Sequence, residues 1–560
     1  MKALVGIAAV IAAALAAVFA FYWGRSGEGS ATVDVGRLSE HIRIVSGDDF
    51  EGRAPASGAG EQKTIDYIVQ QLMEVGVEPG GDAGSGQRRW TQDVPLAQAD
   101  ISGPVTASFN MPGRIMPLEQ GEQIAVRATH LPTQSVALEG APVVFLGYGV
   151  KAPERNWDDF KGMDVRGKVG LVLINDPDFE ADLGGRFGGK AMTYYGRWTY
   201  KYEEAARQGM AGLLVIHEDV PASYGWATVR NSNAASMFDI VRDNPATVHP
   251  PVEGWIQRDV AVQLFTRAGL DFEAEKKKAQ SAAFTPIPIA DATFSISYPV
   301  AQMQVVSKNV VGLLPGRTRP GETIMYTAHW DHLGVGAPDA NGDRIYNGAQ
   351  DNGTGIASLL ELARLFASGP RLERSIVFLF VTAEEKGLLG SAYYAEHPLY
   401  PPEKTAAVYN MDGLATAGPA NEVSLRGGQQ VDLEDDLAAA AATQARRLSP
   451  DTRPEAGYFY RSDHFSFAKI GVPALSINSG QDLMDGGADA GRAAEDEYTA
   501  RRYHQPDDEW SEAMDLRGLA LDTELIFMLG RDLANSTRWP EWKPNSEFKA
   551  VRDASAGARP

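Results

Sequence analysis

Short apolar runs alternate with helical patterns through the second half of the chain. TIMYTA ends before His329, SIVFLFVTA ends before Glu384, and AAVYNM ends before Asp412. Each run is rich in β-branched or aromatic residues, which is typical of a strand buried on both faces of a mostly parallel sheet. The helical patterns IASLLELARLFASG and KGLLGSAYYAEH lie between these runs. The alternation predicts a doubly wound α/β domain.

Residues that can bind metals or transfer protons lie in five segments, and four of these segments stand where a predicted strand ends or the next helix opens. Because the carboxyl ends of parallel strands meet at one edge of a sheet, we expect these side chains to share one pocket. Five segments carry them: AHWDHLG (His329 and Asp331), AQDNGTG (Asp351), TAEEKGLLGS (Glu384 and Glu385), YNMDGLA (Asp412) and YHQPDD (His504).

Histidine nitrogen together with carboxylate oxygen is the ligand set that zinc prefers. Two zinc ions can act on one hydrolytic step when a carboxylate bridges them, and Asp351 is the candidate for that role. Of the neighbours Glu384 and Glu385, one is expected to bind metal and the other to act as general base; their spacing leaves both assignments open. A single segment of this kind is more typical of a helix cap or a turn, but five in this order favour a two-metal hydrolase.

These segments resemble those of the di-zinc peptidase family 28, which contains secreted bacterial aminopeptidases and glutamate carboxypeptidases. The resemblance covers SGDDFEGRAPASGAGEQKTIDYIVQQLMEVGVEPGG and about residues 300 to 535. It implies a zinc exopeptidase-like α/β fold and two Zn²⁺ ions per chain. The roles it implies are one zinc on His329 and Asp412, a second zinc on Glu385 and His504, Asp351 as the bridge, Glu384 as general base, and Asp331 as the group that orients the His329 imidazole.

Other polar and aromatic residues near the motifs carry weaker signals. We interpret His332 as a pocket-wall or solvated residue. Asp463 and His464 in FYRSDHFSFAKIGVPAL are expected near the site, and Tyr458 or Tyr460 is a candidate to stabilise the oxyanion, although core packing is favoured for these aromatic rings.

The pattern changes between about residues 125 and 285, where short strands surround one helical segment. GYGVKAPERNWDDFKGMDVRGKVGLVL resembles a protease-associated domain, and the resemblance implies that this smaller β-rich domain is inserted into the peptidase. An arginine of such a domain reaches the substrate pocket in the carboxypeptidase branch; Arg186 and Arg197 are the candidates, although a solvated position is favoured for both. The predicted boundaries are 32–124 and 286–538 for the catalytic domain, 125–285 for the inserted domain, and 539–560 for a flexible tail.

The first residues indicate export. Lys2 precedes an uncharged apolar stretch from Ala3 to Trp23, which is typical of a secretory signal and is also long enough to span a bilayer. Residues 1–25 are therefore predicted to be a signal peptide or an N-terminal membrane anchor. Both interpretations place the catalytic domain in the periplasm or outside the cell.

The amino-acid composition excludes several classes of binding partner and one class of catalysis. The 560 residues carry a formal net charge of −21, which argues against nucleic acid and anionic membrane surfaces as partners. The chain has no cysteine, which excludes thiol catalysis and disulfides. Peptides are the expected substrates, and the sequence makes no prediction of the oligomeric state.

These observations together predict a secreted or membrane-anchored di-zinc aminopeptidase. An acidic pocket favours an α-ammonium group, and the sequence places no arginine cluster for a terminal carboxylate near the metal motifs. The alternatives are a carboxypeptidase of the glutamate carboxypeptidase type and a single-zinc transferase of the glutaminyl cyclase type. A non-enzymatic binding protein, as in the receptor branch of the superfamily, is disfavoured because every metal-binding motif is intact.

Overall fold

A computed structural model describes residues 32–559, apart from residues 182, 235, 337, 429 and 545. The predicted signal or anchor at residues 1–25 lies outside the described residues. None of the helices in the described part of the chain is long and apolar enough to span a bilayer.

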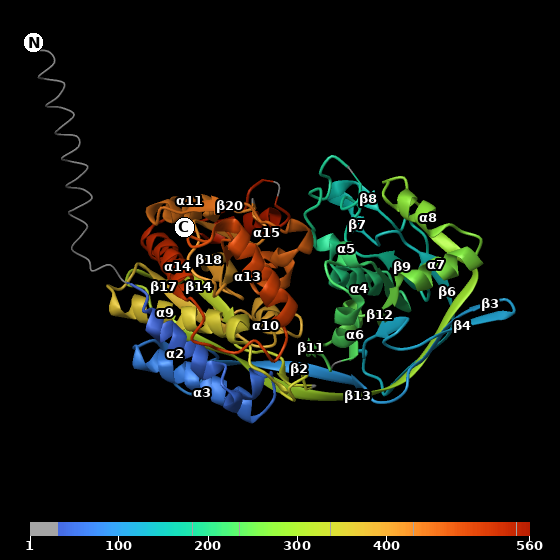
Figure 1. Ribbon diagram of the computed structural model, residues 1–560. Coiled ribbons are helices and arrows are strands. Elements are labelled where there is room, and N and C mark those ends of the chain that lie inside the picture. Colours follow the sequence, from blue (N-terminus) through green and yellow to red (C-terminus); the bar gives the residue numbers. More distant parts are fainter. Residues whose placement is uncertain are drawn as a thin grey trace, which may run out of the picture.

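The chain forms two lobes that share two long strands (Figure 1). Strand β13 (Ile287–Leu314) runs through both lobes, and β2 (Thr91–Ile101) pairs with it in antiparallel register over residues 300–310. The core of the first lobe is drawn from residues 33–77 and 310–548, whereas the core of the second lobe is drawn from residues 99–300.

The first lobe is built on a sheet whose centre is parallel, which confirms the predicted α/β fold class. Every residue of β17 is buried, because helices cover both faces of the sheet. Strands β13 and β19 run antiparallel to the parallel centre at either side of it. In order across the sheet the strands after β13 are β17 (Arg374–Val381), β14 (Arg319–His329), β18 (Thr405–Asn410), β21 (Ala474–Ser479), β19 (Glu422–Leu425) and β20 (Arg447–Ser449).

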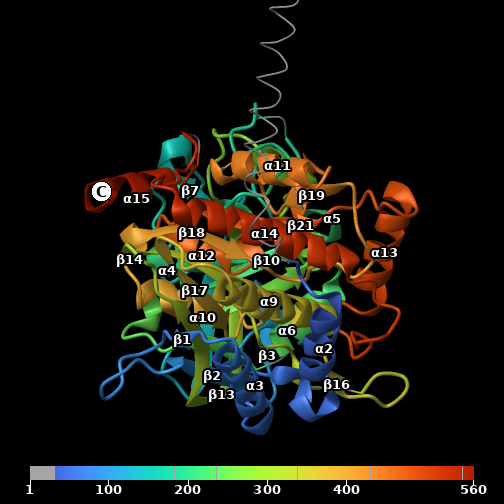
Figure 2. The same ribbon diagram turned by 90° about the vertical axis from the view of Figure 1, so that its left-hand side faces the viewer.

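Helix α9 follows the Asp351 segment and is buried along most of its length. It packs against β14 and β17 of the sheet, and α2 and α14 lie beside it, as seen in Figure 2. The helices of this lobe are α2 (Val35–Val45), α3 (Ala59–Glu74), α9 (Thr354–Ser368), α10 (Leu389–Glu396), α11 (Leu433–Thr443), α12 (His464–Lys469), α13 (Gly487–Arg501), α14 (Arg517–Asn535) and α15 (Lys549–Ala554).

The second lobe contains a sheet that is buried on both faces at its centre. In β10, Leu213 and Val215 pack into one core cluster while Leu214 and Ile216 pack into another, as expected from the alternation of side chains along a strand. Its strands besides β13 are β3 (Thr106–Met111), β4 (Arg114–Leu118), β5 (Ile124–Val126), β6 (Ser135–Phe145), β9 (Val169–Leu173), β10 (Gly212–His217) and β12 (Val252–Gln257). Its helices are α4 (Trp198–Arg207), α5 (Asp219–Ala222), α6 (Trp226–Ala234), α7 (Arg258–Arg267) and α8 (Phe272–Ala279).

The segment predicted as a flexible tail packs on the first lobe instead. Trp542 and Phe548 belong to the core of that lobe, and Trp542 Nε1 donates to the carbonyl of Gly471 at 3.0 Å. Arg552 is buried and Nη1 donates to the carbonyl of Thr405 at 3.2 Å. A few large apolar side chains, which have no periodic spacing in the sequence, therefore anchor the segment from residue 539 through α15 to the first lobe.

Candidate metal centre

The two predicted histidine ligands face one shared carboxylate. His329 Nε2 lies 3.2 Å from Oδ1 of Asp351 and 3.3 Å from Oδ1 of Asp412. His504 Nε2 lies 3.3 Å from Oδ2 of Asp351 and 3.1 Å from Oε2 of Glu385. The two oxygens of Asp351 therefore point to different histidines, and the structure brings all five predicted metal ligands together.

Three of these segments are positioned by strand ends. His329 is the last residue of β14, the paired glutamates follow β17, and Asp412 follows β18. These neighbouring parallel strands deliver their side chains to one edge of the sheet. His504 comes from the loop after α13, where its φ of 58° is in the left-handed region, and the ring of Tyr503 stacks on it at 3.9 Å.

Two residues that sequence reasoning missed hold the segment around Asp351 in place. Oδ2 of Asp508 accepts the backbone N–H of Asp351 at 3.1 Å, and the cis peptide bond between Asp351 and Asn352 follows directly. The side chain of Asn352 accepts from the N–H of Gly413 at 3.2 Å and donates to the carbonyl of Met411 at 3.0 Å. Asp508 is the last residue of the quoted YHQPDD motif, which was the available signal.

The carboxylate of Asp331 does not make its predicted hydrogen bond to the His329 imidazole. Its backbone carbonyl lies 3.0 Å from His329 Nδ1, whereas its carboxylate oxygen lies 3.9 Å from the same nitrogen. The carboxylate turns instead toward the loop after β17, where it accepts the N–H groups of Glu384 at 3.0 Å and Glu385 at 3.3 Å. Asp331 therefore positions the paired glutamates, and its carbonyl, not its carboxylate, orients the imidazole.

Of the two positions expected for His332, pocket wall or solvated, the solvated one is wrong. Its side chain is fully buried, and Nδ1 lies 2.6 Å from Oε1 of Glu385. Nε2 is also buried and has no hydrogen-bond partner among the described residues. His332, Asp351 and Glu385 form one of the groups whose ligand atoms lie within 4.8 Å of one another.

The donor groups at the site fit metal cations. Ligand atoms of His329, Asp351 and Asp412 lie within 4.8 Å of one another, as do those of His329, Glu384 and Glu385. Burial opposes a charge on His329, yet the surrounding carboxylates, Glu384 foremost, hold its pKa well above its ordinary value. A buried group of carboxylates that outnumbers its histidines favours bound cations.

Arg53 from the N-terminal motif supports the centre and was also missed as a site residue. It is fully buried, and its guanidinium group donates to the carbonyls of Trp330 at 2.9 Å, Asn347 at 2.6 Å and Gly348 at 2.8 Å. Its own carbonyl accepts the N–H of His332 at 3.2 Å. The two loops that carry His329 and Asp351 are thereby tied together.

We expect Arg53→Met to lower the free energy of unfolding by at least ~3 kcal/mol, because several buried carbonyls lose their donors at about 1 to 3 kcal/mol each. Urea unfolding of the purified protein measures this. The exposed Arg114 supplies the control, since Arg114→Met should change stability by no more than ~0.5 kcal/mol. Equal stability of the two variants would contradict the role assigned to Arg53.

The residues with weaker sequence signals differ in burial and in the contacts they make. Tyr460 is buried in the core of the first lobe and donates its hydroxyl to Glu547 at 3.0 Å, in line with core packing. Tyr458 is half-buried and lies against the guanidinium of Arg426 at 5.5 Å. Asp463 and His464 are fully buried, and burial raises the pKa of Asp463 to about 7.

An arginine cluster lies beside the centre, contrary to the sequence-based expectation. Arg186 is exposed as expected. Arg197 is only half-buried. Its Nε atom is buried and has no hydrogen-bond partner among the described residues, and the same is true of the Nε atoms of Arg426 and Arg461 in the first lobe. These residues stand far apart along the chain, which is why motif inspection did not group them.

Comparisons with known proteins agree with this geometry. Residues 309–528 match the model of Peptidase family M28, a range that contains every predicted metal ligand. The chain is similar to Aminopeptidase YwaD of Bacillus subtilis, with 27% identity over 176 residues that make up 31% of each protein. It is also similar to the Probable lipoprotein aminopeptidase LpqL of Mycobacterium tuberculosis, with 25% identity over 277 residues, 44% of this chain and 52% of that protein.

The chain thus spans about half or less of the length of these curated relatives. Among solved structures, the aminopeptidase from Aneurinibacillus sp. strain AM-1 shares the fold, with a TM-score of 0.51 and 17% identity over 89% of this chain and 94% of that one. The match to Peptidase family M28 thus covers residues 309–528 of the chain.

Proposed function

We propose that this chain is a zinc-dependent aminopeptidase that removes amino-terminal residues from peptides. The observation that carries the proposal is the carboxylate of Asp351, whose two oxygens lie 3.2 Å from His329 Nε2 and 3.3 Å from His504 Nε2. A carboxylate placed in this way can join two metal sites. The aminopeptidase names of YwaD and LpqL support the same activity.

The residues at the centre fit two zinc ions. His329, Asp412 and Asp351 would hold one ion, and His504, Glu385 and Asp351 would hold the other. His504 Nε2 is buried and makes no hydrogen bond of good geometry although carboxylate oxygens lie 3.1 and 3.3 Å away, an arrangement typical of a ligand nitrogen. Zinc bound here would act as a Lewis acid on the scissile carbonyl and lower the pKa of water.

Glu384 is the proposed general base. Its backbone N–H is fixed by Asp331 at 3.0 Å, and its carboxyl group lies in the donor group that also contains His329 and Glu385. Burial raises the pKa of Glu384 well above its ordinary value, as suits a carboxyl group that accepts and returns a proton. Glu384 accepts a proton from the attacking water and delivers it to the leaving amine nitrogen.

The second lobe and the cellular location complete the proposal. We infer that the second lobe is a protease-associated domain, in line with the resemblance of GYGVKAPERNWDDFKGMDVRGKVGLVL. Export is supported by the apolar stretch from Ala3 to Trp23 and by the lipoprotein name of LpqL. Cell fractionation with N-terminal sequencing of the mature protein distinguishes a cleaved signal from an anchor and tests export itself.

A panel of three peptides tests the proposed activity. Leucine p-nitroanilide should be hydrolysed, N-acetyl-leucine p-nitroanilide should not, and an N-blocked dipeptide with a free carboxyl terminus should be a poor substrate. If the N-blocked dipeptide is hydrolysed fastest of the three, the result would favour the carboxypeptidase alternative. A single zinc per active chain, measured by elemental analysis, would favour the glutaminyl cyclase type.

A further inference from the structure

The two lobes meet at a second place besides their shared strands. The backbone N–H of Met192 in the second lobe donates to the carbonyl of Pro454 in the first lobe at 3.1 Å. The side chain of Met192 is buried against Gly457, where φ is 64° and a Cβ atom would lie 2.7 Å from the Met192 sulfur. The glycine at position 457 therefore permits both the left-handed backbone and the close approach of the second lobe.

Tyr194 extends this contact to the core of the first lobe. Its ring centre lies 5.1 Å from that of Phe465 and 6.2 Å from that of Tyr460, and it packs against the first-lobe core. The next residue, Tyr195, packs instead against the core of its own lobe. Because the Tyr194 hydroxyl donates to Glu203 in α4 at 2.6 Å, the ring is held by the second lobe while it packs on the first.

The turn that receives Tyr194 leads directly to a proposed zinc ligand. This is the 3-10 turn Tyr458–Arg461, and Ser462 follows it. Ser462 is fully buried, and its hydroxyl donates to Oδ2 of Asp412 at 2.5 Å. Since Oδ1 of the same carboxylate lies 3.3 Å from His329 Nε2, the hydroxyl helps to fix the direction in which Asp412 faces the metal centre.

The same turn reaches Asp412 by a second route. The ring of Tyr458 lies 5.5 Å from the guanidinium of Arg426. Nη2 of Arg426 donates to the backbone carbonyl of Asp412 at 2.9 Å. Both the carboxylate and the backbone of Asp412 are therefore connected to the position of the turn.

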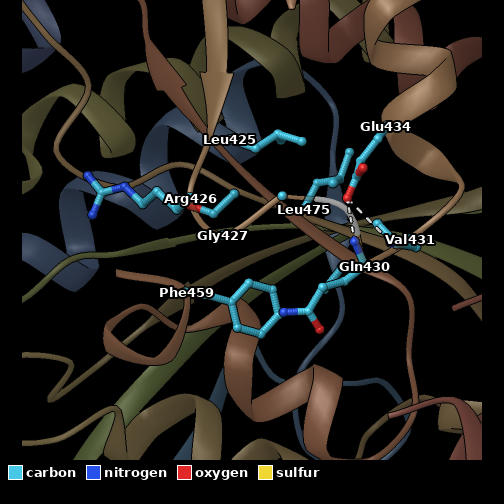
Figure 3. Close-up of a pocket in the computed structure, with 11 residues that line it drawn as sticks. Leu425, Arg426, Gly427, Gln430, Val431, Glu434, Phe459 and Leu475 are labelled. Atoms are coloured by element: carbon cyan, nitrogen blue, oxygen red, sulfur yellow. Dashed lines mark hydrogen bonds between the residues drawn. The ribbon is translucent and has the colours of Figure 1, made fainter. Parts of the chain in front are cut away.

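The packing of the first lobe beside the turn is incomplete. Phe459, within the turn, lines a cavity of about 10 Å³ together with Gly427, Leu475 and neighbouring residues, as Figure 3 shows. This is room for about one water molecule. Side chains that border a void lack partner atoms on that side, so the contact with Tyr194 supplies a larger share of the support of the turn.

We propose that Tyr194 is a positioning residue of the metal centre. By docking on the first lobe it holds the turn, and with it Ser462, where Asp412 can bind zinc. The inference rests on the proposed zinc centre. It gives the second lobe a part in metal binding, although every proposed ligand belongs to the first lobe.

The zinc affinity of matched variants tests this role. Competition with a chromophoric chelator measures the Kd of each zinc site in the purified protein. Mutation of an outer-shell partner usually weakens metal binding by 10- to 100-fold, so Ser462→Ala should raise the Kd of one site by ~10- to 100-fold, and Tyr194→Ala, which acts through Ser462, by ~10-fold. Tyr194→Phe keeps the ring and should keep the wild-type Kd. Tyr195→Ala should keep it too, because that ring packs against the core of its own lobe.

A covalent bond in place of the aromatic contact gives an independent test. The chain has no cysteine, and a Cβ atom at Gly457 would lie 3.2 Å from the Cβ of Met192, close to the about 3.5 to 4.5 Å of a disulfide. In the Tyr194→Ala background, Met192→Cys/Gly457→Cys should regain zinc affinity on oxidation and lose it on reduction. Oxidised protein whose disulfide is confirmed by mass spectrometry but whose zinc affinity stays low would rule out docking of the lobes as the cause.

The outcomes separate this role from the proposed function and from folding. A wild-type protein that binds no zinc would overturn the proposed function. Equal zinc affinities in the wild type, Tyr194→Ala and Tyr195→Ala would overturn the role of Tyr194. If Tyr194→Ala does not fold, Met192→Ala, which only shortens the side chain against Gly457, should weaken the same zinc site to a smaller extent, and an unchanged Kd there would overturn the proposal.

Discussion

Replacing Glu384 with glutamine should lower kcat by about 10²- to 10⁴-fold, the usual loss when general acid-base catalysis is removed. The amide keeps the size of the side chain but accepts no proton. Because Glu384 is not among the proposed zinc ligands, the zinc content of the variant should stay near that of the wild type. Steady-state kinetics with leucine p-nitroanilide and elemental analysis measure the two quantities.

The neighbouring glutamate supplies the matched comparison. Glu385 lies 3.1 Å from His504 and 2.6 Å from His332, so that Glu385→Gln should lower zinc content together with activity. Reversed phenotypes would exchange the two roles. An active Glu384→Gln enzyme with full zinc would remove Glu384 from the reaction altogether.

Changing Asp351 to asparagine should weaken both metal sites at once. Among the described residues, Asp351 is the one whose two oxygens lie near both His329 and His504, and an amide supplies only one neutral oxygen. Loss of outer-shell partners alone weakens metal binding by 10- to 100-fold, so losing the bridge should weaken zinc affinity by at least ~100-fold. Isothermal titration of the zinc-free variant with zinc measures the affinity, and activity should fall in parallel.

A surface aspartate controls for the loss of charge. The side chain of Asp489 is 93% exposed, and Asp489→Asn should leave zinc affinity unchanged. Two tightly bound zinc ions in the Asp351→Asn variant would show that Asp351 does not bridge. Loss of one ion alone would assign Asp351 to a single site.

The strands and the ligands at their ends could be predicted because both signals are local. Apolar runs such as TIMYTA and SIVFLFVTA identify buried parallel strands, and the carboxyl ends of such strands place His329, Glu384 and Asp412 at one edge. This pattern alone is enough to predict the confirmed α/β fold class. The roles of Glu385 and His504 as ligands came from the family resemblance, because spacing leaves the two glutamates open and His504 follows helix α13, not a strand.

The supporting residues could not be predicted because their contacts link distant segments. Arg53 reaches carbonyls nearly 300 positions away, and nothing near it in the sequence indicates that its guanidinium is buried. Asp331 was assigned by its spacing from His329, but the turn between them places the carbonyl, not the carboxylate, at the ring. The packed segment after residue 538 depends on isolated side chains such as Trp542, which carry no periodic signal.

The central claim, that hydrolysis depends on a pair of zinc ions held around Asp351, is tested most directly by removing the metal and returning it in measured amounts. The wild-type protein is dialysed against a chelator until elemental analysis finds no metal, and is then titrated with zinc while the hydrolysis of leucine p-nitroanilide is followed. The expected result is no activity without metal and a rise that reaches its plateau at two zinc ions per chain. Undiminished hydrolysis by the metal-free protein would contradict the account.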